Sequence, residues 1–125
     1  MKPTIAVLGA STDRSKFGNK AVRAYLQQGY DVFPVNPKAD SVEGTAAYPT
    51  VADIPVSKLD RVTVYLPAPV ALGVLGQLAE KEIGEVHFNP GADDPEVLAK
   101  ARELGLNVVT GCSILAIGVR PDELG

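Results

Sequence analysis

A polar segment with two bases follows the first apolar run of the chain, and its residue types suit the binding of an anion. In order, its candidate ligand groups are Gly9, Ala10, Ser11, Thr12, Arg14 and Lys16. The glycine permits a tight turn, the backbone N–H groups of the small residues can point at an anion, and the two bases add full positive charges. A phosphate or diphosphate would fit these groups. The alternative interpretation is an ordinary polar loop with solvated bases.

The same segment lacks the fingerprints of two common nucleotide sites. A dinucleotide fingerprint needs two further glycines, where this chain has Ser11 and Arg14, and an acid after the second strand. The second apolar run instead ends in Asn36, Pro37 and Lys38. A base at this place favours an extra phosphate on the ribose, as in NADP or coenzyme A. The Lys-Ser/Thr pair of an ATP-binding P-loop is also absent.

The elements that must position these residues alternate between strand and helix patterns. Continuous apolar runs predict buried parallel strands at 4–9, 30–35, 61–66, 85–89 and 107–110. Helical spacing of apolar residues predicts helices at 18–28, from Pro69 onward, and from a capping Asp94 onward. We expect a doubly wound, Rossmann-like α/β fold whose five parallel strands have the order 3-2-1-4-5. Pro34 conflicts mildly with an interior place for the second strand.

In such a sheet, ligands bind at the carboxyl ends of the strands. Besides the segments already named, this edge would hold Leu66, Pro67 and Pro69 after the third strand and Asn89, Pro90 and Gly91 after the fourth. Cys112 follows the fifth strand. The tail from Cys112 onward has no firm placement: its apolar residues could form a dimer contact or fold back on the sheet.

Length and composition narrow the class of protein. The chain has 125 residues, a net charge of −3 and a single cysteine, which indicate one domain over residues 1–125 and exclude a disulfide framework. The acidic balance argues against nucleic acid as the partner. Neither a leader nor a membrane segment is evident, so we expect a cytoplasmic monomer or homodimer. Residues 1–40 nevertheless carry six bases and three acids, which suggests a local anion site.

Taken together, these segments resemble the small CoA-binding proteins, whose domain is similar to the N-terminal CoA-binding domain of the succinyl-CoA synthetase α subunit. The resemblance extends over nearly the whole chain, and its most specific element is the Gly-Tyr-x-Val-x-Pro-Val-Asn-Pro run at residues 29–37. Many members have Trp and Gln where this chain has His87 and Asn89. Many also have Asp-Arg-Cys where this chain has Thr110-Gly111-Cys112.

The resemblance implies a role for each segment at the carboxyl edge. The loop would bind the CoA diphosphate through Ser11, Thr12, Arg14 and Lys16. The second segment, Asn36, Pro37 and Lys38, would lie near the adenosine, and Leu66, Pro67 and Pro69 would line the adenine. The pantetheine arm would pass Asn89, Pro90 and Gly91.

Catalytic and metal sites are not evident. His87 is the only histidine, and neither it nor Cys112 has a triad partner or metal-ligand spacing. We expect His87 to pack in the core or at the surface, the alternative being contact with a ligand. We expect Cys112 to be a buried structural thiol, the alternative being a thiol beside the sulfur of CoA. Asp13 would repel a phosphate unless it pairs with Arg14 or turns outward.

Three functions remain open on the sequence. The first is a stand-alone module that binds coenzyme A or a short acyl-CoA. The second is an enzyme that uses NADP or another nucleotide, and the third is a regulatory interaction domain whose nucleotide site is vestigial.

Overall fold

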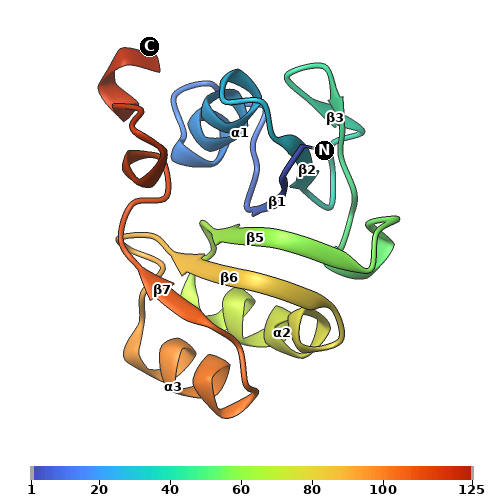
Figure 1. Cartoon of the computed structure of the whole chain (residues 1–125), viewed down its shortest axis with the longest axis vertical. Coiled ribbons are helices and arrows are strands. Elements are labelled where there is room, and N and C mark those ends of the chain that lie inside the picture. Colours follow the sequence, from blue (N-terminus) through green and yellow to red (C-terminus); the bar gives the residue numbers. More distant parts are fainter. Residues whose placement is uncertain (1, 125) are drawn as a thin grey trace.

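A five-stranded parallel sheet with helices on both faces forms the centre of the molecule (Figure 1). The computed structural model describes residues 2–124. The strands of the sheet are β1 Thr4–Leu8, β2 Asp31–Val35, β5 Lys58–Val64, β6 Glu82–Phe88 and β7 Val108–Thr110. The helices are α1 Phe17–Gln27, α2 Ala68–Ala79 and α3 Pro95–Glu103. A small hairpin is formed by β3 Ser41–Val42 and β4 Thr45–Ala46. There are also three short 3-10 helices in the described residues, η1 Val51–Asp53, η2 Leu115–Ile117 and η3 Pro121–Leu124.

The strands read as continuous apolar runs because both faces of the sheet are covered. Along β1, Ile5 and Val7 pack into the cluster under α1, whereas Ala6 and Leu8 pack into the cluster under α2 and α3. Side chains of a strand alternate between faces, so a buried strand with two covered faces shows no polar alternation. The predicted doubly wound α/β class is therefore confirmed.

The strand order is β2-β1-β5-β6-β7. The chain starts at β1, adds β2 on one side of it, and then adds β5, β6 and β7 on the other side, so the topological switch point lies at β1. The strand order differs from the predicted 3-2-1-4-5 order in one place: the strand expected beyond β2 lies beside β1, as β5. The position beyond β2 is held by a single parallel bridge between Val35 and Tyr48. The carbonyl of Pro34 accepts from the Tyr48 N–H at 2.9 Å, so Pro34 faces this outer edge. Proline has no N–H to donate there, which disfavours a full strand.

The predicted helices are present with shifted ends. Helix α1 buries Ala21, Val22 and Tyr25 against the sheet, and Gly29 follows its end with a φ of 83°. Asp94 caps α3 by accepting from the N–H groups of Glu96 and Val97, as predicted. None of the helices in residues 2–124 is long and apolar enough to cross a membrane.

The tail after β7 folds back over the α1 side of the sheet (Figure 1). Ile114 is fully buried there and Ile117 packs against the same cluster, whereas Leu115 is exposed. Tyr25 donates from its hydroxyl to the Ser113 carbonyl at 2.7 Å, and the Arg23 guanidinium donates to the Leu124 carbonyl. These contacts join the tail to α1.

Candidate functional site

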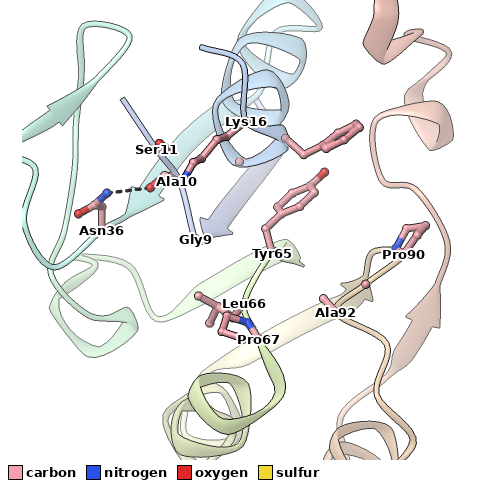
Figure 2. Close-up of a pocket in the computed structure, with 13 residues that line it drawn as sticks. Gly9, Ala10, Ser11, Lys16, Asn36, Tyr65, Leu66, Pro67, Pro90 and Ala92 are labelled. Atoms are coloured by element: carbon pink, nitrogen blue, oxygen red, sulfur yellow. Dashed lines mark hydrogen bonds between the residues drawn. The ribbon is translucent and has the colours of Figure 1, made fainter. Parts of the chain in front are cut away.

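Three neighbouring hollows lie along the carboxyl edge of the sheet. The loop pocket has a volume of about 550 Å³ and is lined by Gly9, Ala10, Ser11, Lys16, Phe17, Gly18, Asn36, Tyr65, Leu66, Pro67, Pro90, Gly91 and Ala92 (Figure 2). The helix pocket, of about 210 Å³, is lined by Leu8, Gly9, Ala10, Val35, Asn36, Pro37, Pro49, Thr50, Val51, Leu66, Val70, Val74 and Gln77. The tail pocket, of about 480 Å³, is lined by Phe17, Lys20, Tyr65, Asn89, Pro90, Cys112, Pro121 and Asp122.

The three pockets form a series, with the loop pocket in the middle. It shares Gly9, Ala10, Asn36 and Leu66 with the helix pocket. It shares Phe17, Tyr65 and Pro90 with the tail pocket. The helix pocket and the tail pocket have no lining residue in common. An elongated ligand could therefore run from one end pocket to the other only through the loop pocket.

Two glycines let the backbone of the first loop close up against its neighbours. Gly9 has a φ of 85°, and a Cβ built on it would collide with the carbonyl oxygen of Tyr65. A Cβ on Gly18 would collide with the carbonyl oxygen of Gly9. Only glycine fits at either position, because backbone atoms cannot give way as a flexible side chain can. The first turn of α1 thus packs directly on the turn after β1.

The N-terminus of α1 borders the loop pocket without a protein cap. Lys16 occupies the cap position and makes no side-chain capping hydrogen bond, and the N–H groups of Phe17 and Gly18 have no acceptor within the helix. Phe17, Gly18 and Lys16 all line the loop pocket. By contrast, α3 is capped by the Asp94 carboxylate. Free N–H groups, the positive end of the helix dipole and a lysine together make the loop pocket favourable to an anion.

Asn36 ties the second loop to the first. Its Nδ2 donates to the Ala10 carbonyl at 2.9 Å, as Figure 2 shows, and its Oδ1 accepts from the N–H groups of Lys38 at 2.7 Å and Ala39 at 3.1 Å. Both ends of the carboxamide are therefore used to hold the turn after β2 against the turn after β1. Asn36 lines both the loop pocket and the helix pocket, and these hydrogen bonds fix its position between them.

Arg14 and Asp13, also in the first loop, line none of the three pockets. Arg14 is 63% exposed in its side chain and lies 3.7 Å from a carboxylate oxygen of Glu43. The Asp13 carboxylate accepts from the N–H and hydroxyl of Ser15, and these hydrogen bonds lower the pKa of Asp13. The Asp13 carboxylate therefore stabilises the turn through its hydrogen bonds with Ser15.

Asn89 joins β6 to β5 and to the tail. It is 2% exposed, its Nδ2 donates to the Thr63 hydroxyl at 2.7 Å and the Val64 carbonyl at 2.9 Å, and its Oδ1 accepts from the Ser113 N–H at 2.9 Å. The Ser113 hydroxyl in turn meets the Tyr65 hydroxyl at 3.2 Å. Burial raises the pKa of Tyr65 to about 12, so this phenol stays protonated at neutral pH. The network fixes the wall between the loop and tail pockets.

His87 and Cys112 differ in their access to the site. His87 is buried at 4% exposure, and its Nε2 lies 3.1 Å from a Glu85 carboxylate oxygen. Burial lowers the pKa of His87 despite that partner. It lines none of the three pockets. Cys112 is half-buried and lines the tail pocket.

Most of the residues proposed from the sequence come together at this edge. Nine of them line the loop pocket: Gly9, Ala10, Ser11, Lys16, Asn36, Leu66, Pro67, Pro90 and Gly91. Pro37 lines the helix pocket and Asn89 lines the tail pocket. The other four are exposed and line none of the three, namely Thr12, Arg14, Lys38 and Pro69.

Sequence reasoning missed several residues that line the pockets. Tyr65 directly follows β5 and lines both the loop pocket and the tail pocket. Val70, Val74 and Gln77 share one face of α2 at helical spacing, which was the available signal for the helix pocket. The residues Pro49, Thr50 and Val51 also line the helix pocket, and no periodic pattern in the sequence indicated that they would.

Comparison with known proteins relates the chain to a family of domains. The sequence profile of the family described as CoA binding domain matches residues 3–118. The α subunit of acetate–CoA ligase (ADP-forming) II from Pyrococcus furiosus is 28% identical over 116 residues, which span 84% of this chain and 25% of that protein. The Archaeoglobus fulgidus acetate–CoA ligase (ADP-forming) II is 34% identical over 82 residues, which span 64% of this chain. This chain spans only 12% to 25% of the length of these curated relatives.

Among solved structures, a hypothetical protein from Pyrococcus horikoshii superposes with a TM-score of 0.81 at 32% identity, over 90% of this chain and 78% of that one. With residues 3–118 of its 125 residues matched by the profile, the chain belongs to the CoA binding domain family.

Proposed function

We propose that this protein binds coenzyme A, or a short acyl-CoA, as a stand-alone binding module. The adenine would occupy the helix pocket, the diphosphate the loop pocket, and the pantetheine arm would run toward the tail pocket. The observation that carries the proposal is the series of three pockets, because CoA has the same three-part order. The pockets at the two ends are largely apolar, and the loop pocket between them combines apolar walls with Lys16 and the start of α1, which matches this order.

The diphosphate assignment rests on the α1 N-terminus. The uncapped N–H groups of Phe17 and Gly18, the Lys16 ammonium and the closely packed Gly9 turn border one hollow. Backbone donors at a helix start bind phosphate oxygens without needing a specific side chain. Arg14 would contribute less, since it is exposed and paired with Glu43. Ser11 and Thr12 would act through their backbone.

The adenosine assignment rests on the turn that Asn36 holds. Pro37 lines the helix pocket, and Lys38 is exposed on the same turn. Lys38 would therefore approach the 3′-phosphate of CoA, while Leu66, Val35 and Pro37 would pack on the purine. A ligand without the 3′-phosphate would lose the ion pair and keep the packing.

The pantetheine assignment rests on the apolar tail pocket. Phe17, Tyr65 and Pro90 connect it to the loop pocket, and Cys112 lies in its wall. A volume of about 480 Å³ leaves space for the end of the arm and a short acyl group. Asn89 would act indirectly, because all its polar atoms are already bonded within the protein.

The relatives support binding of CoA more directly than they support catalysis. They are named as acetate–CoA ligases, and this chain matches a minor part of each. We therefore propose binding without ligation by this chain alone. A cytoplasmic location and a monomeric or homodimeric state complete the proposal, since an unpaired cysteine suits a reducing compartment.

Thermal unfolding with four nucleotides tests the proposal. CoA, dephospho-CoA, NADP and ADP are each added near millimolar concentration. A ligand at 100-fold its dissociation constant stabilises a protein by about 2.7 kcal/mol, which raises the midpoint of a domain of this size by roughly 10 °C. We expect CoA to raise it most and dephospho-CoA less. A larger rise with NADP, or no rise with CoA, would contradict the proposal.

A further inference from the structure

A buried amide oxygen without a partner lies among the residues of the helix pocket. Within the described chain, Oε1 of Gln77 is buried and makes no hydrogen bond. The rest of the lining is largely aliphatic or proline, including Val35, Pro49, Val51 and Val74. Leaving a buried polar atom unpaired costs about 1–3 kcal/mol, so such an atom in a native protein calls for an explanation.

The place of Gln77 on α2 directs its side chain toward the carboxyl edge. Val70, Val74 and Gln77 are spaced by four and three residues, so they lie one above the other on the same helix face. Helix α2 starts at that edge of the sheet, after β5, and runs away from it. Side chains of a helix tilt toward its N-terminus, which carries the Gln77 carboxamide back toward the pocket mouth.

We propose that Gln77 recognises the adenine of the ligand, its Oε1 accepting a hydrogen bond from the 6-amino group. This inference rests on the proposed function and assigns the residue that selects the base. The aliphatic walls hold the two faces of the purine, and the carboxamide meets its amino edge. Oε1 of Gln77 is covered by protein atoms, so the carboxamide turns toward the pocket of about 210 Å³ when this bond forms.

The chemistry of the carboxamide fits the adenine edge in full. Adenine offers a donor at its 6-amino group and an acceptor at N1, side by side. A glutamine side chain offers an acceptor and a donor in the same spacing. Among the buried side-chain polar atoms that the structure describes, the pairing supplies a partner for Oε1 of Gln77. Specificity of this kind arises because a base without the amino group leaves the buried oxygen unpaired.

The test is a cycle of two proteins and two ligands, in which isothermal titration calorimetry measures the dissociation constant of each pair. The ligands are CoA and a CoA analogue whose purine carries hydrogen in place of the 6-amino group. The proteins are the natural chain and Gln77→Met, which keeps the side-chain length and removes both polar atoms. We expect the natural protein to bind CoA about 3- to 10-fold more tightly than the analogue, the range of one neutral hydrogen bond. We expect Gln77→Met to bind the two ligands equally.

Two controls separate recognition from folding. Gln27→Met makes the same change at an exposed glutamine of α1 and should preserve the preference for CoA. Gln77→Met should have an unfolding midpoint no lower than that of the natural protein, since it removes an unpaired polar atom. An undiminished preference for CoA in Gln77→Met would overturn the inference and leave CoA binding standing. Absence of CoA binding by the natural protein would overturn the proposed function itself.

Discussion

The two ends of the loop pocket are built in different ways. On the side of the first loop, the wall consists of backbone: Gly9 and Gly18 bring peptide groups into contact, and the α1 N-terminus is left uncapped. On the side of the tail, the wall is a network of buried side chains centred on Asn89 and Ser113. The shape of the first wall depends on glycines, which have no side chain. The shape of the second wall depends on hydrogen bonds between side chains and with the backbone.

The difference explains which part of the site can vary. In the proposed function, a phosphate would be bound by backbone geometry that nearly any small residue at position 11 or 12 can supply, provided the glycines remain. The tail pocket is shaped by particular side chains, so its form changes with each of them. We therefore expect the nucleotide end to be common to proteins with this loop, and the thiol end to decide what each one carries.

The largest effect is expected at Gly9. Gly9→Ala introduces a Cβ at a φ of 85° and against the Tyr65 carbonyl, so we expect a loss of about 3–5 kcal/mol in the free energy of unfolding, measured with urea. Gly76→Ala is the matched control, because nothing lies within 4 Å of its added Cβ on α2. It should stabilise the protein by about 0.5–1 kcal/mol. Equal stability of the two variants would refute the account of the loop.

A smaller loss is expected on the tail side. Asn89→Leu leaves the Val64 carbonyl and the Ser113 N–H without their partner, which costs about 2–3 kcal/mol in the same urea measurement. Asn107→Leu is a control at an exposed asparagine whose side chain makes one hydrogen bond, to the Gly84 carbonyl. Its loss should be about 1 kcal/mol or less. If Asn89→Leu were as mild as its control, the tail would not depend on this network.

Two basic residues of the first loop should differ in their effect on binding. Lys16→Ala should weaken CoA binding about 10-fold, because Lys16 lines the loop pocket beside uncapped N–H groups. Arg14→Ala should weaken it by about 3-fold or less, because Arg14 is exposed and paired with Glu43. Calorimetry at fixed ionic strength measures both. A larger effect at Arg14 would mean that this side chain leaves Glu43 when the ligand binds.

The smallest effect concerns acid stability and His87. Burial holds the folded-state pKa of His87 below the usual 6.5, so the unfolded chain takes up a proton more readily than the folded one. Its contribution to stability is complete above pH 6.5 and is lost as the pH falls through 6.5 toward the folded-state pKa. His87→Gln keeps a donor for Glu85 and cannot titrate. Its unfolding midpoint should therefore fall less between pH 7 and pH 5; a fall equal to that of the natural protein would exclude His87 as the cause.

Much of the lining of the loop pocket was predictable from the sequence because its segments follow strands. Gly9, Asn36 and Pro67 lie at strand ends, and parallel strands bring their carboxyl ends to one edge. The strand order was wrong in one place because a single bridge at Tyr48 replaces a strand, although Pro34 had indicated an edge. The tail pocket could not be predicted, since contacts such as that between Arg23 and the Leu124 carbonyl join residues about a hundred positions apart.

The most direct test of the central claim is a titration of the ¹⁵N-labelled protein with CoA, followed by the backbone amide signals. The account predicts the largest shifts at Gly9, Ser11 and Gly18 around the loop pocket, with further shifts at Gln77 in the helix pocket and Cys112 in the tail pocket. The amides of α3, which borders none of these pockets, should stay in place. Shifts centred on α3 with the loop unchanged would contradict the account.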